Sequence, residues 1–223
     1  MEMRRRRTMS SPDNTSITTG LWYLFPVIVS GVCLCLSSTL LYAGALDKAF
    51  DELRSPEAVV NTESQSQVIQ NSFPADKPLT IAFVREKLWQ KPGSTRINDM
   101  QSIEMDALVA RTILGSMPVR VQEGLVTDLP QDPFKLARLL EATEGFKTPK
   151  ADQVLIRSLS DTRSSELPLS ITDGWHLRIC DVAYNTLVHR RRLTQFRAPL
   201  GTSYALASRD RWIKQLQEWL EHH

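Results

Sequence analysis

The stretch LRICDVAYNTLV, residues Leu177–Val188, is the most informative part of this 223-residue chain. Its apolar side chains cover far more than one narrow stripe of a helix, whereas Arg178, Asp181 and Asn185 fall on one polar row. A helix with so much apolar surface has to pack against neighbours on several sides. We therefore expect it to occupy the centre of an arrangement of stacked helices.

Cap residues and apolar spacing predict where this helix and its neighbours begin and end. The central helix should start after Thr172 or Asp173, with Trp175 in its first turn, and end near His189. The same kinds of signal, together with Gly or Pro beyond the helix end, predict helices over residues 100–115, 133–143, 150–159 and 209–220.

The sequence leaves the secondary structure of two stretches ambiguous. Residues 79–89 contain β-branched side chains that suit a strand, although we expect a helix there. Residues 119–126 show only a partial alternation of apolar and polar side chains. Because no stretch combines Asn-Gly hairpin turns with regular alternation, the fold class expected is mainly α.

The segments VLIRSLSDTR and LRICDVAYNTLV together resemble the HEAT repeat family, whose units are helical hairpins. In that family an Asp lies in the turn and an Arg lies early in the second helix, and Asp161 and Arg178 match these positions. Ala183 and Leu187 match the small and large packing positions. The resemblance covers residues 150–189, although the loop over residues 162–172 is longer than the family's usual turn.

The resemblance implies a HEAT-like α-solenoid fragment. It further implies that the Arg178 guanidinium reaches the Asp161 carboxylate and ties the second helix to the preceding turn. Such a charge-assisted contact is worth about 1.5–3 kcal/mol when it is partly buried. On this interpretation Arg178 has a structural role and does not touch a substrate.

An uncharged run near the N-terminus, LWYLFPVIVSGVCLCLSSTLLYA over residues 21–43, predicts a membrane-spanning helix. Its length of about 23 residues exceeds the roughly 20 that a bilayer requires. A cleaved signal peptide is the alternative, because Ala43-Gly44-Ala45 resembles a cleavage site and basic residues precede the run. The length of the apolar run favours a retained anchor.

The charges beside this run predict its orientation. Arg4–Arg7 precede it, whereas no positive excess follows it, so the N-terminus should lie in the cytoplasm and the remainder outside. Beyond the span Cys180 is the only cysteine, and the single Asn-x-Ser/Thr pattern, at Asn14, precedes the span. An extracytoplasmic domain without disulfides or glycosylation sites is more typical of a bacterial envelope, so we expect a single-pass protein of the inner membrane.

The expected domain organisation has four parts. Residues 1–20 form a cytoplasmic basic tail, residues 21–43 the transmembrane helix, residues 44–77 a polar linker or stalk, and residues 78–223 the small helical domain outside the cytoplasm. The tail carries four Arg against two acidic residues, which accounts for the whole net charge of +2. The balanced remainder argues against nucleic acid as a partner.

Catalytic and ligand-binding alternatives find little support. Cys180 lies on the broad apolar face of its helix, where a free cysteine behaves as a small hydrophobe and not as a nucleophile. The histidines have no paired Cys or Glu at metal-ligand spacing, and the scattered glycines form no phosphate-binding loop. The run His189–Arg192 suits the negative end of a helix dipole and is expected to be a solvated helix terminus. We therefore predict no catalytic, cofactor-binding or metal-binding residues, and no enzyme.

Two functions fit these observations. The first is a membrane-anchored helical-repeat module in the cell envelope, which binds another protein as a scaffold and takes no small-molecule substrate. The second is a single-span subunit of an envelope secretion or conjugation machine, in which residues 21–43 contribute to the assembly.

The topology is testable directly. A reporter fused after His223 should be active only outside the cytoplasm, because Arg4–Arg7 hold the N-terminus inside. Mass spectrometry of the purified chain should find residues 1–20 still attached. A mature chain beginning near Leu46 would show that residues 21–43 are a cleaved signal and not an anchor.

Overall fold

The computed structural model describes residues 44–54, 67, 69–71, 77–92, 97–168, 176–201 and 203–223. The chain divides into two units, Met1–Ala45 and Leu46–His223. The predicted basic tail, residues 1–20, and the predicted membrane span, residues 21–43, lie outside the described residues. Within the described ranges, no helix is both long enough and apolar enough to cross a bilayer.

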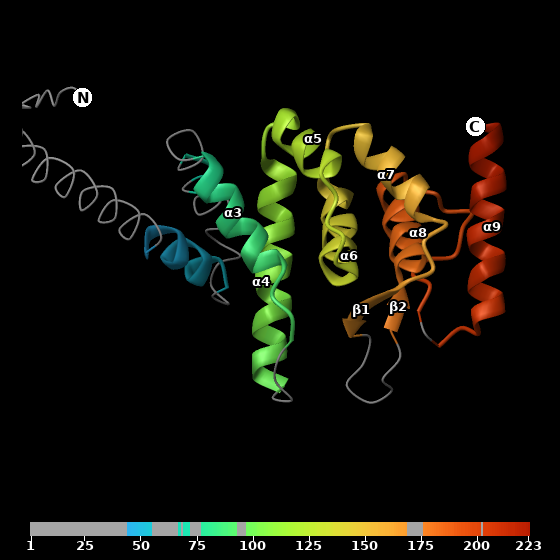
Figure 1. Ribbon diagram of the computed structural model, residues 1–223, viewed down its shortest axis with the longest axis horizontal. Coiled ribbons are helices and arrows are strands. Elements are labelled where there is room, and N and C mark those ends of the chain that lie inside the picture. Colours follow the sequence, from blue (N-terminus) through green and yellow to red (C-terminus); the bar gives the residue numbers. More distant parts are fainter. Residues whose placement is uncertain are drawn as a thin grey trace, which may run out of the picture. The chain divides into compact units, whose positions relative to one another are not determined.

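The second unit is mainly helical, as the sequence predicts (Figure 1). A helix over residues 44–54 comes first. The elements that follow are α3 (Lys77–Leu88), α4 (Ile97–Ser116), α5 (Val119–Thr127), α6 (Pro133–Ala142), the short 3-10 helix η2 (Thr143–Gly145), α7 (Lys150–Ser158), β1 (Ser164–Pro168), β2 (His176–Arg178), α8 (Ile179–Arg190) and α9 (Leu206–His222). The helices expected from residues 79, 100, 133, 150 and 209 onward are therefore confirmed, with ends that differ by a few residues.

Helix α6 is enclosed by its neighbours. Helices α4 and α8 lie on either side of it, α3 packs against α4, and α9 packs against α8 (Figure 1). Almost every α6 side chain is buried, from Phe134 to Ala142. The broad apolar face of α6 requires neighbours on both sides, and its polar residues Arg138 and Glu141 are paired with charged groups. Its start is also well defined, because Asp132 accepts a hydrogen bond from the Lys135 backbone N–H at 2.9 Å and Pro133 follows as the first helical residue.

The undecided stretch at residues 119–126 is helix α5. Its sequence pattern is ambiguous because the polar Gln122 is buried together with the apolar residues of this helix. The Gln122 side-chain amide donates to the carbonyls of Leu114, Gly115 and Met117 at 3.2, 2.9 and 3.0 Å, and so satisfies the end of α4. The same side chain accepts a hydrogen bond from the Lys147 backbone N–H at 2.7 Å. These contacts with distant backbone groups favour a helix where the local pattern is ambiguous.

The compact unit begins at Leu46, and not at residue 78 as predicted. Leu46, Ala49, Phe50 and Leu53 are buried, although the sequence assigned them to a linker. The Phe50 and Phe83 rings meet edge to face with centroids 5.2 Å apart, which joins this first helix to α3. The helix is short and polar residues follow it, so its sequence pattern resembles that of a stalk.

The start of the central helix differs from the prediction. Residues 176–178 form strand β2, which pairs antiparallel with β1, and α8 begins only at Ile179. Two backbone hydrogen bonds explain this boundary. The Ile179 N–H donates to the Arg163 carbonyl at 2.9 Å, and the Cys180 N–H donates to the Asp161 carbonyl at 2.8 Å. The first amides of α8 are thus satisfied by the turn that follows α7, and the expected start near residues 172–175 lies outside the described residues.

A buried carboxylate organises this helix start. Asp181 is fully buried and accepts a hydrogen bond from the Arg178 backbone N–H at 3.0 Å. The Arg178 guanidinium also contacts Asp181 at 3.0 Å and reaches Asp210 of α9 at 2.8 Å. A second guanidinium, from Arg209 of α9, donates to Asp181 inside the core. One carboxylate therefore joins the first turn of α8 to α9.

The contact between Arg178 and Asp161 implied by the HEAT resemblance is wrong. The Asp161 carboxylate pairs with Arg163 instead, with an Oδ2 to Nη2 distance of 2.7 Å. That hydrogen bond from Arg163 lowers the pKa of Asp161. The turn and the second helix do meet, but they meet through the Asp161 carbonyl and the Cys180 N–H. Arg178 is nearer to Asp181 because the two residues share one helical turn.

The buried ion pair between Asp181 and Arg209 predicts non-additive unfolding energies. Asp181→Ala should lower the free energy of unfolding by about 3–5 kcal/mol, because it leaves the Arg209 charge buried and unpaired. Arg209→Met should also destabilise the chain, whereas the double variant should lose less than the sum of the two, since Arg178 keeps Asp210. Denaturant unfolding of the three variants measures this, and additive losses would contradict the pairing.

Candidate functional site

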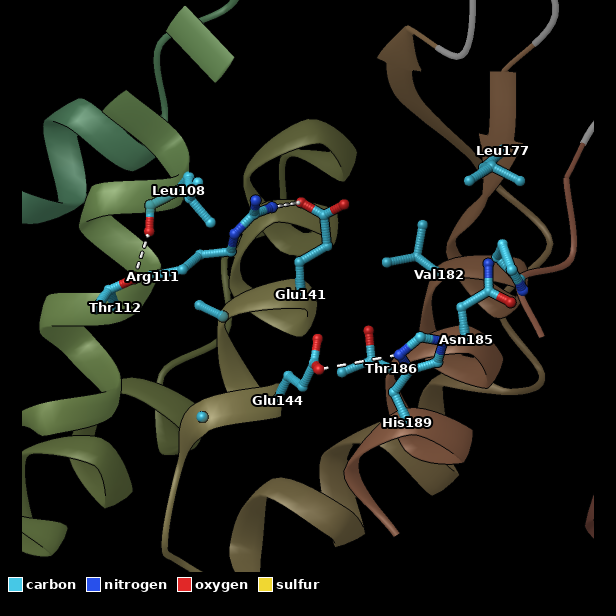
Figure 2. Close-up of a pocket in the computed structure, with 13 residues that line it drawn as sticks. Leu108, Arg111, Thr112, Glu141, Glu144, Leu177, Val182, Asn185, Thr186 and His189 are labelled. Atoms are coloured by element: carbon cyan, nitrogen blue, oxygen red, sulfur yellow. Dashed lines mark hydrogen bonds and ion pairs between the residues drawn. The ribbon is translucent and has the colours of Figure 1, made fainter. Parts of the chain in front are cut away.

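A cleft of about 590 Å³ opens between α4, the end of α6 with η2, and α8 (Figure 2). We call it the α4–α8 groove. It is defined by Leu108 and Arg111 from α4, Glu141 and Glu144 from α6 and η2, and Val182 and His189 from α8. Helix α6 forms its floor because α4 and α8 lie on either side of that helix.

Apolar side chains cover part of the groove. Ala142 and Val182 are almost completely buried in its floor and wall, whereas Leu108 on the opposite wall is 49% exposed. Met105 lies one turn before Leu108 on α4 and is also exposed. A single exposed leucine is ordinary, but one that lines a cleft offers apolar contact area to a ligand.

Two arginines and two glutamates neutralise each other beside the groove. Arg111 meets Glu141 at 2.8 Å (Figure 2), and Arg138 meets the same glutamate at 3.3 Å. Arg138 is buried and also donates to Glu104 at 3.1 Å. Burial alone would lower the pKa of Arg138, but the hydrogen bond that it donates to Glu104 and the nearby carboxylate charges raise this pKa overall. The four groups therefore contribute no net charge.

Glu144 is the carboxylate of the groove that has no guanidinium partner among the described residues. Its neighbour across the groove is the imidazole of His189, with 4.0 Å between Oε1 and Nδ1 (Figure 2). With histidine counted as neutral, the groove carries one unbalanced negative charge. This charge lies at the end of the groove where η2 approaches α8.

Arg190 holds the backbone around Glu144 in place. Its guanidinium donates to the carbonyls of Thr143 at 2.8 Å and Thr148 at 3.1 Å, and also to that of Phe146. On the other side η2 meets α4 through two glycines, since a Cβ added to Gly115 would lie 3.2 Å from the Gly145 carbonyl oxygen. The turn that carries Glu144 is therefore fixed between α4 and α8.

These contacts also revise the interpretation of the run His189–Arg192. Arg190 is largely buried and Arg191 pairs with Asp152 at 3.0 Å, so neither side chain is simply solvated. Arg192 is exposed and adopts a positive φ of 54° at the position after the helix cap, where the Leu193 N–H donates to the Val188 carbonyl at 2.9 Å. This is the Schellman arrangement that ends many helices.

Cys180 is 2% exposed, which confirms the predicted packing role. Burial, followed by the charge of Asp181, raises the pKa of the thiol to about 11. The thiol is therefore protonated at neutral pH, and a protonated, enclosed thiol is a poor nucleophile. Among the histidines, His189 lies in the groove, whereas His222 and His223 lie at the end of α9. In the described part of the chain, no group of three or more His, Cys, Asp or Glu could hold a metal ion.

Sequence reasoning missed the groove, although α4 contains a usable signal. Met105 and Leu108 lie outside its buried stripe, which comprises Asp106, Ala107, Val109, Ala110, Ile113 and Leu114. Apolar residues on a second face of a helix indicate a further contact. No comparable signal identifies Glu144, because its importance depends on how Glu141, Arg111 and Arg138 pair in three dimensions.

The Cys180 environment predicts slow modification. In a variant with Cys33→Ser and Cys35→Ser, a thiol reagent should label native Cys180 at least roughly 100-fold more slowly than the unfolded chain at pH 8. Because the folded pKa lies above the unfolded one, the thiol contributes stability that is present below about pH 8.5 and lost as the pH rises toward about 11. Rapid labelling of the native protein would instead indicate an accessible thiolate.

Comparison of the chain with models of protein families, with curated proteins and with solved structures finds no match. The groove and the charges within it are therefore the features that bear on function.

Proposed function

We propose that this chain is a membrane-anchored, HEAT-like helical module of the cell envelope that binds a protein partner in the α4–α8 groove. The observation that supports this most is the exposed Leu108 on the wall of a cleft whose Arg111 is already paired with Glu141. Such a surface offers apolar contact and a few oriented polar groups. Protein recognition sites commonly combine these two properties.

The polar groups of the groove suit binding better than catalysis. The Thr112 hydroxyl donates to the Leu108 carbonyl at 3.0 Å, and Asn185 both donates to and accepts from the backbone of Leu200. His189 faces Glu144, but in the described part of the chain neither hydroxyl that lines the groove, Thr112 or Thr186, is hydrogen-bonded to that pair. A catalytic site would need a nucleophile and a base within hydrogen-bond reach of each other.

The proposed anchor rests on the uncharged run over residues 21–43. Arg4–Arg7 favour a cytoplasmic N-terminus, which places the helical unit outside the cytoplasm as a single-pass protein of the inner membrane. A tethered binding module of this kind would concentrate its partner at the membrane surface.

A second function is a single-span subunit of an envelope secretion or conjugation machine. The burial of Leu46 and Phe50 favours it, because the compact unit then starts within a few residues of the proposed span. A binding module on a long stalk would not need this proximity. In the subunit, contacts made by residues 21–43 would hold the assembly, and the groove would contribute little.

The exposed leucine tests the binding function. Leu108→Glu should reduce recovery of the cross-linked partner from membranes by about tenfold or more, because a carboxylate in an apolar contact costs at least about 1.4 kcal/mol. Leu206→Glu is the matched control, since Leu206 is also 49% exposed but lies on α9. Both variants should melt at the same temperature as the unchanged chain.

The same comparison separates the two functions. If the chain is a machine subunit held by its span, Leu108→Glu leaves the large complex intact on native gels in mild detergent. Equal losses for Leu108→Glu and Leu206→Glu would argue against a specific role for the groove.

A further inference from the structure

We infer that the segment bound in the α4–α8 groove is an amphipathic α-helix of the partner that carries a Lys or Arg opposite Glu144. This inference rests on the proposed binding function and adds the chemistry of the occupant. Three features support it: the helical walls of the groove, its apolar surface, and its single unbalanced carboxylate.

The walls favour a helical occupant. Helices α4 and α8 both pack against α6, and the groove lies between them over the last turn of α6 and η2 (Figure 2). The backbone groups within these three helices are already hydrogen-bonded. Strand β2 contributes only Leu177 to the lining, and the Leu177 carbonyl accepts a hydrogen bond from the Ser165 hydroxyl, so the groove offers little strand edge to an extended peptide. A helix satisfies its own backbone and can lay one apolar face against Leu108, the exposed apolar side chain of the wall.

The charges favour a basic occupant. Arg111 is engaged by Glu141 at 2.8 Å, so an acidic partner would have to displace an existing ion pair. An acidic partner would also approach the Glu144 carboxylate, whose one ion-pair partner in the described chain is His189 at 4.0 Å, since Arg190 reaches only the Glu144 backbone carbonyl at 3.4 Å. A Lys or Arg at that point instead balances the charge of the groove. Electrostatic complementarity of this kind selects between partners of similar apolar surface.

A display experiment tests both parts of the inference. The probe is a library of helical peptides with leucines fixed along one face and with Lys, Glu or Gln allowed at each flanking position. Selection is carried out on the full-length chain in detergent. One flanking position should be enriched in Lys over Glu by about tenfold, because hydrogen bonds between charged groups discriminate by at least that factor.

Charge reversal locates the contact. On Glu144→Lys the preference should change to Glu at the same position, whereas Glu218→Lys should keep the preference for Lys. Glu218 is the matched control because its side chain is 59% exposed, like that of Glu144, and lies on α9. Folding should survive Glu144→Lys, since Arg190 holds the neighbouring carbonyls and not the Glu144 carboxylate. Leu108→Glu should enrich no peptide.

Several results would overturn the inference. These are the absence of enrichment, enrichment without a charge preference, a preference for Glu on the unchanged chain, or a preference for Lys that survives Glu144→Lys. Self-association that Leu108→Glu abolishes would show that a second copy occupies the groove.

Failure of this inference is distinguishable from failure of the proposed function. If Leu108→Glu blocks the natural partner but no Lys preference appears, the groove binds a partner of different chemistry. If the charge reversal succeeds but Leu108→Glu leaves the natural partner bound, the groove chemistry is correct and the proposed function is wrong.

Discussion

The buried carboxylate of Asp181 is the constraint on which the C-terminal half of this unit depends. It takes hydrogen bonds from the Arg178 backbone and side chain and from the Arg209 guanidinium, all within a region closed to water. A buried charge is tolerated only when such partners surround it. Asp181 therefore caps the first turn of α8 and ties α9 to it. The position of α8 in turn determines the position of one wall of the groove.

Two other arginines extend the same principle. Arg138 lies inside the unit and faces Glu104 and Glu141, and so joins α6 to α4. Arg190 reaches from the end of α8 to the carbonyls that follow α6. In each case a guanidinium satisfies several acceptors at once, as its planar set of donors allows. Together with Arg209, these two arginines fix the positions of α4, α6, α8 and α9 relative to one another.

The groove is a consequence of this arrangement. Because α6 is enclosed by α4 and α8, only its last turn and η2 remain open to a ligand between them. Arg111 and Glu141 satisfy each other there, whereas Glu144 is left exposed by a backbone that Arg190 and the Gly115–Gly145 approach hold in place. The unbalanced charge is therefore built into a fixed turn. This is the physical reason for treating the site as one of recognition, with an oriented carboxylate beside an apolar wall.

The sequence by itself determined the features that depend on neighbouring residues. Asp132 and Pro133 predicted the start of α6, Thr148 and Pro149 predicted that of α7, and apolar spacing predicted α4 and α9. The broad apolar face of α8 predicted the burial of Cys180. Tertiary structure alone decided the features that depend on distant groups. Buried Gln122 of α5 caps the end of α4. Arg178 pairs with Asp181 and Asp210 and not with Asp161, and the Asp161 and Arg163 carbonyls accept from the first amides of α8. Local signals report backbone preference, whereas the pairing of buried charges and amides depends on which atoms the fold brings within hydrogen-bond distance.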